Sequence, residues 1–378
     1  MQNSLINCSD SHMRRCFELA MGGDGLVSPN PLVGALLVKN GKIIGEGFHV
    51  ESGQHHAEVN TINRVKGSIE GSTLYCNLEP CCHTNKRTPP CTDLIISRGI
   101  SRVVISNLDP NPLVSGRGVE RLRQAGIEVS VGLLEEKGHL LNEVFFKYIT
   151  TKRPFVHLKV AQTIDGRIAT SSGHSKWITN QSSRARVHQL RAKYDAICVG
   201  RETLNLDNPQ LTVRLDPPYR GKAPYRVILG NPNKMNLDSR VFNDSLADRT
   251  IVACSDVELS KLNLTARNLL ESRNVKFIEI DETRKGKIDW AKLIARLGEC
   301  MITSLFIEGG SGIYSDLISN RLVDRLSIFI APKVFGSGKN WLQYTDIDRV
   351  EDSIGFMIED VKTFDQQILV EMLPLNKE

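Results

Sequence analysis

The chain has 378 residues, which is long enough for two domains that each bury a core of their own. Its composition, with 40% hydrophobic and 24% charged residues, is ordinary for a globular protein and excludes disorder along the whole chain. The formal net charge of +5 suits anionic small molecules such as phosphates, and it is too diffuse to indicate a nucleic-acid partner.

The first half of the chain alternates short strands with helices, which predicts an α/β layer with helices packed on a sheet. Asn40-Gly41, a strong turn signal, lies between the first two strands and predicts a hairpin. The expected strands are residues 33–38, 42–48, 73–78, 102–106 and 127–131. The expected helices begin at His56, Pro90 and Val119, and a polar helical stretch covers residues 135–150.

This half carries one imidazole, two thiols and a carboxylate in a pattern that indicates zinc chemistry. They belong to His56-Ala57-Glu58, Glu79-Pro80-Cys81 and Pro89-Pro90-Cys91. Zinc held by three protein ligands keeps a fourth position open for water, which is typical of a catalytic site. The pKa of such a water falls to about 7, so it supplies hydroxide at neutral pH. Glu58 can pass protons between that water and a leaving amine, as in the zinc nucleobase deaminases.

The spacing also predicts how these groups are directed. Apolar residues recur at helical intervals after Glu58, so His56 is expected to open a helix. Successive helical residues turn by roughly 100°, so His56 and Glu58 point in different directions. Pro90 favours a helix start, which places Cys91 in a first turn where the helix dipole stabilises a thiolate.

A structural zinc site, or buried cysteines without metal, is the alternative interpretation. Structural sites usually have four ligands, with cysteines paired two to four residues apart. Cys81, Cys82 and Cys91 do not form two such pairs. The sequence therefore favours a catalytic centre.

The alternation of strands and helices restarts after Lys152-Arg153-Pro154, which we predict to be a domain boundary. We expect one domain over residues 1–150 and a second over residues 151–378. The expected strands of the second domain are residues 155–163, 195–199, 225–229, 250–253, 275–280 and 304–307, and its helices are residues 182–193 and 313–319.

The last of these strands leads into Glu308-Gly309-Gly310-Ser311-Gly312 ahead of a helix. A strand followed by a glycine-rich turn and a helix can cradle a phosphate, because backbone N–H groups and the helix end face the anion. A tight turn without a ligand is the alternative. The full Gly-x-Gly-x-x-Gly pattern is absent, so a standard Rossmann domain is not supported.

Together these residues resemble one family, the bifunctional riboflavin-biosynthesis deaminase/reductases, from about Cys8 to the end of the chain. The matching stretches of the first half are Asn30-Pro31-Leu32-Val33-Gly34, His56-Ala57-Glu58, Leu78-Glu79-Pro80-Cys81, Thr88-Pro89-Pro90-Cys91 and Asp109-Pro110-Asn111-Pro112. Those of the second half are Ile164-Asp165-Gly166-Arg167-Ile168-Ala169, Ser175-Lys176-Trp177-Ile178-Thr179, Asp207-Asn208-Pro209, Leu211-Thr212 and Glu308-Gly309-Gly310. The deaminase stretches alone also fit cytidine, guanine and tRNA-adenosine deaminases, whereas both sets in one chain are specific.

The resemblance implies a three-layer cytidine-deaminase-like N-terminal domain and a dihydrofolate-reductase-like C-terminal domain. It implies Zn²⁺ and NADPH as cofactors and 2,5-diamino-6-ribosylamino-4(3H)-pyrimidinone 5′-phosphate as the substrate. Zinc hydroxide would attack the ring carbon that bears the 2-amino group, and ammonia would leave. NADPH would then reduce the ribosyl group to a ribityl chain.

The resemblance also implies the residues of both sites. It assigns His56, Cys81 and Cys91 as zinc ligands and Glu58 as the proton shuttle. The residues that match nucleotide contacts of the deaminase are Asn30, His49, His83 and Lys86. The residues that match cofactor positions are Ala161, Trp177, Thr203, Asp207, Gly310, Ser311, Gly312, Ile313, Tyr314, Ser315 and Asp316. The residues that match substrate positions of the reductase are Ser175, Arg191, Leu211, Arg214 and Glu308.

Some of these assignments have alternatives. The two arginines suit a phosphate because a guanidinium donates a fork of hydrogen bonds, although Arg191 and Arg214 could also belong to a solvated helix face. Trp177 could be a core aromatic residue.

Two further positions stay open where the chain departs from the family. Cys81 and Cys91 lie ten positions apart, one more than the resemblance leads us to expect, and Cys82 stands where a serine is usual. Either Cys81 or Cys82 could be the second ligand, and the preceding Glu79-Pro80 favours Cys81. The extra residue also leaves open whether Lys86 or Arg87 contacts the nucleotide.

Two other functions serve as alternatives. A nucleic-acid-editing deaminase needs a basic groove and stacking aromatics, whereas this chain has 6% aromatic residues and no clustered basic run in its first half. A zinc-stabilised interaction protein would unfold when the metal is removed. We expect a small-molecule substrate, no nucleic-acid or membrane partner and, as in relatives, a homo-oligomer.

The cysteines and the N-terminal residues indicate where the protein works. Nine cysteines, an odd number in a chain of this length, do not suggest a disulfide framework, and reduced thiols predict a cytoplasmic location. The first ten residues have no apolar signal core, and no segment approaches the ~18 apolar residues of a membrane helix. We therefore expect neither export nor membrane insertion.

Overall fold

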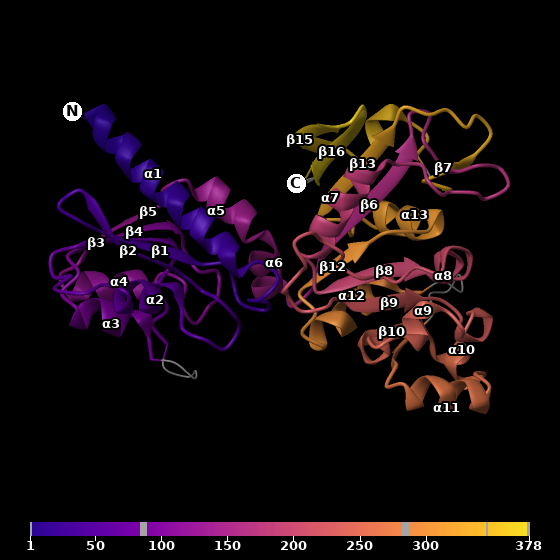
Figure 1. The fold of residues 1–378 in the computed structure, drawn as a ribbon, viewed down its shortest axis with the longest axis horizontal. Coiled ribbons are helices and arrows are strands. Elements are labelled where there is room, and N and C mark those ends of the chain that lie inside the picture. The colour runs from indigo at the N-terminus through magenta and orange to yellow at the C-terminus, as the bar shows by residue number, and fades with distance from the viewer. Residues whose placement is uncertain (1, 84–88, 282–287, 345–346, 376–378) are drawn as a thin grey trace. The chain divides into compact units, whose positions relative to one another are not determined.

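The computed structural model describes residues 2–83, 89–281, 288–344 and 347–375. The chain divides into two compact units, Met1–Lys152 and Arg153–Glu378, and each has a sheet of its own (Figure 1). Among the described residues, no helix combines the length and the apolar content that a membrane span requires.

The first unit is built on a five-stranded sheet with the order β2-β1-β3-β4-β5. β1 pairs with β2 and β3 in antiparallel fashion, and β3, β4 and β5 are parallel to one another. The strands are β1 Gly34–Lys39, β2 Lys42–Phe48, β3 Thr73–Leu78, β4 Arg102–Asn107 and β5 Glu128–Val131. The helices are α1 Gln2–Ala20, η1 Met21–Gly23, α2 Ala57–Asn63, α3 Cys91–Ser97, α4 Arg117–Gln124, α5 Glu135–Leu141 and α6 Glu143–Thr151.

Alternating residues of β1 show why this sheet has helices on both faces. Ala35 and Leu37 belong to a core on the side of α2, α3 and α4, whereas Leu36 and Val38 pack with Met13 of α1 on the opposite face. Figure 1 shows α1 and α5 over one face and α2, α3 and α4 over the other. This arrangement confirms the expected three-layer α/β fold.

The helical stretch expected over residues 135–150 is present and consists of two helices, α5 and α6. Asn142 separates α5 from α6 with a backbone φ of −113° and ψ of 21°, which lies outside the helical range. Its buried side chain bonds to the backbone of Leu32 on a distant loop. A tertiary contact therefore interrupts a sequence that favours helix locally.

The second unit is built on a nine-stranded mixed sheet with the order β11-β10-β9-β8-β12-β6-β13-β16-β15. The strands from β11 to β13 in this order are parallel, and β16 and β15 add an antiparallel edge. The strands are β6 Phe155–Thr163, β8 Ala196–Gly200, β9 Tyr225–Leu229, β10 Thr250–Ser255, β11 Lys276–Ile280, β12 Ser304–Ile307, β13 Arg325–Ala331, β15 Phe356–Phe364 and β16 Gln367–Pro374, and the short β7 Arg167–Ala169 pairs with β14 Lys339–Asn340.

Helices cover both faces of this sheet, as β8 illustrates. Ala196 and Cys198 face a core that includes α12 and α13, whereas Ile197 and Val199 face a second core. The helices are α7 Gln181–Arg191, α8 Arg201–Asp207, η2 Pro232–Lys234, α9 Arg240–Asn243, η3 Ala247–Arg249, α10 Asp256–Ser260, α11 Leu264–Ser272, α12 Trp290–Glu299, α13 Ser311–Ser319 and η4 Val350–Asp352. Because β6, β8 and β12 are parallel, the loops at their carboxyl ends lie along one edge, where ligands of such sheets bind.

Candidate active sites

Three metal-ligating atoms converge in the first unit. His56 is the N-cap of α2, Cys81 follows β3, and Cys91 is the first residue of α3. The Nδ1 atom of His56 lies 3.5 Å from the Sγ atom of Cys81 and 3.4 Å from that of Cys91. Tetrahedral zinc with its usual bond lengths separates nitrogen and sulfur ligands by roughly 3.6 Å, so these three residues fit zinc.

The cysteine left open by the sequence lies outside this group. The ligand atoms of His56, Cys81 and Cys91 all lie within 4.8 Å of one another, and no fourth His, Cys, Asp or Glu from the described part of the chain joins them. The Cys82 sulfur is instead 4.0 Å from the Leu113 carbonyl oxygen. The geometry therefore favours Cys81, and a three-ligand site leaves a coordination position for water.

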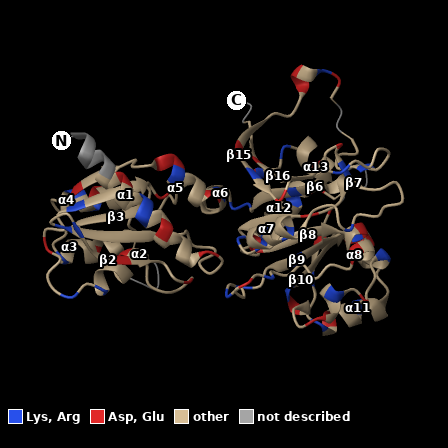
Figure 2. Ribbon diagram, turned by 45° about the horizontal axis from the view of Figure 1, so that its top comes forward, with Lys and Arg blue, Asp and Glu red and all other residues tan. Residues whose placement is uncertain are grey.

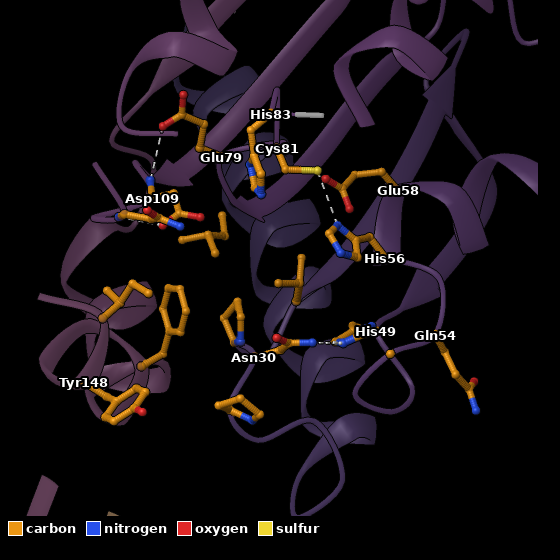
Figure 3. A pocket seen from close by; sticks show the side chains of 18 residues that line it. Asn30, His49, Gln54, His56, Glu58, Glu79, Cys81, His83, Asp109 and Tyr148 are labelled. Atoms are coloured by element: carbon orange, nitrogen blue, oxygen red, sulfur yellow. Dashed lines mark hydrogen bonds between the residues drawn. The ribbon is translucent and has the colours of Figure 1, made fainter. Parts of the chain in front are cut away.

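Glu58 occupies the first turn of α2 and is almost completely buried, with 3% of its surface exposed. Figure 3 shows its side chain beside those of His56 and Cys81. Burial raises the pKa of Glu58 above its ordinary value, because removal from water disfavours the charged form. A carboxyl group with a raised pKa next to a metal site is suited to accept a proton and give it back.

A second buried carboxylate, that of Glu79, organises the loop that carries Cys81. Its two oxygens accept hydrogen bonds from four backbone N–H groups at distances of 2.9–3.2 Å; the donors are Asp109, Gly116, Gly118 and Val119. Two of these donors lie in the first turn of α4 and favour negative charge. At Gly118 a Cβ atom would lie 2.3 Å from the Pro80 carbonyl oxygen, so only glycine allows this approach.

A cavity of about 360 Å³ opens onto these groups, and all of its lining residues belong to the first unit. His56, Glu58 and Cys81 lie at one end, with Asn30 and His49 across from them (Figure 3). The lining residues are Pro29, Asn30, Pro31, Val33, His49, Gly53, Gln54, His56, Glu58, Leu78, Glu79, Cys81, His83, Asp109, Asn111, Phe145, Tyr148 and Ile149. Its size suits a nucleotide-sized ligand.

Asn30 and His49 form a defined pair in this cavity. The Nδ1 atom of His49 lies 3.0 Å from the carbonyl oxygen of His55, so it donates and carries the hydrogen. Burial lowers the pKa of His49, which favours the neutral ring. Its Nε2 atom then accepts from the Asn30 side-chain amide at 3.1 Å, and the Asn30 carbonyl oxygen can serve a ligand.

His83 also lines the cavity, whereas Lys86 and Arg87 lie outside the described residues. Sequence reasoning gave no role to Asp109 and Asn111, although their stretch was noted, and it missed Phe145, Tyr148 and Ile149 of α6. The helix itself was expected as part of the helical stretch over residues 135–150. No local pattern in the sequence showed that this helix lines the cavity.

In the second unit, the carboxyl ends of three parallel strands bring together residues expected to bind the cofactor. Ala161 lies on β6, Thr203 on α8 after β8, and Gly310 after β12. At Gly309 a Cβ atom would lie 2.8 Å from the Thr203 hydroxyl, so the glycine allows the β12 turn to approach α8. Gly310 has a φ of 101°, which glycine adopts without strain.

The turn expected to contact the cofactor, residues 310–316, forms the start of α13, and its side chains do not all face one way. Ile313, Tyr314 and Ser315 are buried, and the Tyr314 hydroxyl donates to the Lys159 carbonyl oxygen at 2.9 Å. Asp316 accepts from the Tyr344 hydroxyl at 2.7 Å. The backbone of the first turn is therefore the part of this segment best suited to an anion.

Glu308 is the centre of a buried charged group at the end of β12. Arg191 of α7 pairs with both carboxylate oxygens, and the Lys159 ammonium lies 3.8 Å away. Burial alone would raise the pKa of Glu308, but Arg191 and Lys159 bring it down to about 2. Burial lowers the pKa of Lys159, and Glu308 opposes that effect. Sequence reasoning missed Lys159, which lies in a strand of apolar residues.

Arg214 lies close to this group. Its guanidinium is 2.5 Å from the side-chain amide oxygen Oε1 of Gln210 and 3.2 Å from the Nε2 atom of His188, and neither partner is a carboxylate. Burial, helped by Arg191 and Arg214, lowers the pKa of His188 to about 4. Leu211 is buried nearby at 2% exposure with a φ of 51°. Arg191 is paired with the Glu308 carboxylate, whereas Arg214 has no carboxylate among these partners, so the Arg214 guanidinium suits an anionic ligand.

Trp177 is 65% exposed, so the core-aromatic alternative was wrong. The Arg184 guanidinium lies over its ring at 4.4 Å, and Lys333 donates to its carbonyl oxygen at 2.8 Å. The preceding Lys176 lies 3.5 Å from the Asp207 carboxylate at the end of α8, which connects the 175–179 segment to the carboxyl edge of the sheet. Ser175 belongs to the same segment.

Comparison with known proteins shows the family to which each unit is similar. Residues 6–107 match the family model of the cytidine and deoxycytidylate deaminase zinc-binding region, and residues 154–370 match that of the RibD C-terminal domain. The riboflavin biosynthesis protein RibD of Actinobacillus pleuropneumoniae is 40% identical over 99% of this chain and 98% of its own length. The RibD of Aquifex aeolicus is 41% identical over 95% of this chain and 97% of its own.

Solved structures give the same result. Form 1 of Acinetobacter baumannii RibD superposes with a TM-score of 0.87 at 32% identity and covers 98% of this chain and 100% of its own. A Thermotoga maritima protein, a diaminohydroxyphosphoribosylaminopyrimidine deaminase/5-amino-6-(5-phosphoribosylamino)uracil reductase, superposes with a TM-score of 0.85 at 40% identity. That match covers 98% of this chain and 99% of the other.

Proposed function

The chain belongs to the RibD family of bifunctional riboflavin-biosynthesis enzymes, and from this premise we propose which of its residues carry out each reaction. It is a zinc-dependent deaminase and an NADPH-dependent reductase in one polypeptide. We propose that the deaminase substrate is 2,5-diamino-6-ribosylamino-4(3H)-pyrimidinone 5′-phosphate, in agreement with the activity named for the Thermotoga relative. The convergence of His56, Cys81 and Cys91 beside Glu58 supports this most directly.

His56, Cys81 and Cys91 would hold the zinc ion of the deaminase. The metal supplies, when bound, a Lewis acid that lowers the pKa of a coordinated water to about 7. The N-terminus of α3 supports thiolate at this place, since the Cys91 N–H donates to the Cys81 sulfur at 3.4 Å. Asn30 and His49 would hold the pyrimidine ring, and His83 with Lys86 would hold the ribosyl phosphate end of the nucleotide.

Glu58 would move the protons of the deamination. Its buried carboxylate can take a proton from the attacking water and deliver it to the 2-amino nitrogen, which then leaves as ammonia. The raised pKa of Glu58 suits both steps, because the group must be protonated and deprotonated within one turnover.

The carboxyl edge of the second sheet would hold the reductase site. NADPH supplies, when bound, a hydride for the ribose carbon that becomes the end of the ribityl chain. Ala161, Trp177, Thr203, Asp207 and the backbone of residues 310–316 would bind the cofactor. The residues proposed for the substrate are Ser175, Arg191, Leu211, Arg214 and Glu308. Arg214, with its uncharged partners, is the group best suited to the phosphate.

We assign the deaminase to residues 1–150 and the reductase to residues 151–378. The two family models, over residues 6–107 and 154–370, support this assignment. A nucleic-acid-editing deaminase is not favoured, because the homologues are full-length riboflavin-biosynthesis enzymes. In the view of Figure 2, basic and acidic residues are interspersed over both units.

We also propose a cytoplasmic location and a homo-oligomer. Cys81 and Cys91 must be reduced to bind zinc, and NADPH is a cofactor of reducing compartments. The edge strand β15 exposes Met357, Ile358 and Val361, which a second copy of the chain could cover. Light scattering after size-exclusion chromatography measures the oligomeric state directly.

Replacement of Glu58 by glutamine tests the deaminase assignment. The amide preserves the shape of the side chain but cannot accept and return a proton, so ammonia release should fall by about 10²–10⁴-fold. Zinc content and NADPH oxidation with the deaminated intermediate should remain at the wild-type level. Near-normal ammonia release from a zinc-loaded Glu58→Gln protein would contradict the assignment.

A further inference from the structure

Asn142 bonds to a loop that lies 110 positions earlier in the chain. Its Oδ1 atom accepts from the Leu32 N–H at 2.8 Å, and its Nδ2 atom donates to the Leu32 carbonyl oxygen at 2.9 Å. The side chain is 3% exposed. One amide therefore satisfies both backbone groups of Leu32, as a neighbouring strand would do.

Asn77 of β3 makes a second pair of hydrogen bonds to the same segment. Its Nδ2 atom donates to the same Leu32 carbonyl oxygen at 2.9 Å, and its Oδ1 atom accepts from the Gly34 N–H at 2.7 Å. Asn77 is 1% exposed. The carbonyl oxygen of Leu32 thus has both of its lone pairs occupied, and the segment from Leu32 to Gly34 is fixed by two buried amides.

The contacts join two walls of the deaminase cavity. Leu32 immediately follows Asn30 and Pro31, which line it, and Asn142 immediately precedes α6, whose Phe145 and Tyr148 line it from the other side. The neighbouring Val33 carbonyl accepts from the His49 N–H at 2.8 Å, which extends the connection to the partner of Asn30. The catalytic groups come from α2, α3 and the loop after β3, whereas the side-chain amide of Asn142 is hydrogen-bonded to the backbone of Leu32.

We propose that Asn142 is a positioning residue of the deaminase, which sets the separation between Asn30 and the α6 wall so that the cavity fits the pyrimidine nucleotide. The inference rests on the proposed deaminase function. Asn142 also explains why the helical stretch stops after α5: the residue leaves the helical conformation to reach Leu32, and α6 then starts in a direction that brings Phe145 and Tyr148 to the cavity.

The test is Asn142→Asp in the full-length, zinc-loaded enzyme. The carboxylate is close in shape to the amide and still accepts from the Leu32 N–H, but it places an acceptor opposite the Leu32 carbonyl oxygen. We expect the KM for the diamino substrate to rise by about tenfold or more, with kcat of ammonia release within about threefold of wild type. The kinetics of NADPH oxidation, which belong to the other unit, should not change.

The matched control is Leu122→Ala, which removes a fully buried side chain from α4 in the same unit and should lower its stability without touching either wall. A rise in KM for Asn142→Asp but not for Leu122→Ala supports positioning. An unchanged KM for Asn142→Asp, or an equal rise in both variants, overturns it. If Asn142→Asp does not fold, Asn142→Ser removes the same contacts without adding a charge and is judged by the same KM. A wild-type enzyme that releases no ammonia would instead contradict the proposed function.

Discussion

Cys81 and Cys82 are adjacent in the chain, but the structure places only one of them at the candidate metal site. The sequence left Cys81 and Cys82 as alternatives, because the spacing to Cys91 is one residue longer than expected and Cys82 stands where a serine is usual. Only Cys81 lies near His56 and Cys91, at 3.5 Å from the histidine Nδ1 atom. The register is set by Glu79, whose carboxylate accepts hydrogen bonds from the first turn of α4 and from the loop ahead of it.

Serine substitutions distinguish the two cysteines. Cys81→Ser should lose most of its zinc, since a hydroxyl is a far weaker zinc ligand than a thiolate, and ammonia release should fall by at least about a hundredfold. Cys82→Ser should keep one zinc per chain and near-normal activity. Metal analysis of both purified proteins is the measurement, and loss of zinc from Cys82→Ser alone would reverse the assignment.

The Glu308 carboxylate gives a pH-dependent prediction. Its pKa is about 2 in the folded protein and about 4.5 when unfolded, so the unfolded state binds more protons between these values. The stability that Glu308 contributes is therefore complete above about pH 4.5 and is lost as the pH falls toward 2. The difference in urea midpoint between wild type and Glu308→Gln should shrink between pH 6 and pH 3. A difference that stays constant over that range would contradict the charged pair with Arg191.

Residues that act in one local motif could be read from the sequence, whereas residues that act through distant contacts could not. His56, Glu58 and Cys91 lie at helix starts that the sequence marks with apolar residues at helical intervals after Glu58 and with a proline before Cys91. Lys159 was missed because its role depends on Glu308, which only the parallel pairing of β6 and β12 brings near.

At the scale of elements, the start of α4 depends on a side chain from another strand. Glu79 supplies the acceptor for two N–H groups of its first turn and for two more of the preceding loop. The N-cap residue of α4 is Gly116, which has no side chain that could accept these hydrogen bonds. A carboxylate that follows β3 therefore fixes both the helix and the cysteine loop.

Glu79→Ala should leave these four donors without their acceptor and lower the stability of the first unit by about 2–4 kcal/mol. Glu120→Ala, which removes an exposed carboxylate from the same helix, is the control and should change stability by less than about 0.5 kcal/mol. Thermal unfolding of the zinc-loaded proteins measures both. Equal stability of the two variants would show that the hydrogen bonds of Glu79 contribute little to the stability of the first unit.

Elements with strong local signals were predicted well, and elements defined by their surroundings were not. The hairpin at Asn40-Gly41 forms as expected, with positive φ at both residues. β13, β15 and β16 were not predicted from the sequence. β13 is buried on both faces and so lacks alternation, whereas β15 is an exposed edge that alternates weakly. The break at Asn142 depends on Leu32, a contact that no local pattern could reveal.

Considered as a whole, the molecule carries two proposed sites, and each is built from the residues of a single unit. The lining residues of the deaminase cavity all belong to Met1–Lys152, and the charged group around Glu308 belongs to Arg153–Glu378. The fold class of each unit followed from the alternation of strands and helices, and the restart of that pattern gave the expected boundary.

The most direct test measures ammonia release and NADPH oxidation separately, each with its own substrate, in His56→Ala and Asp207→Ala. His56→Ala should abolish ammonia release, because His56 is a proposed ligand of the zinc ion in the first unit. It should spare NADPH oxidation, which is assigned to the second unit. Asp207→Ala should impair NADPH oxidation and spare ammonia release, because its contacts to Lys176 lie in the second unit. Loss of both activities in a folded, zinc-loaded Asp207→Ala protein would contradict two independent sites.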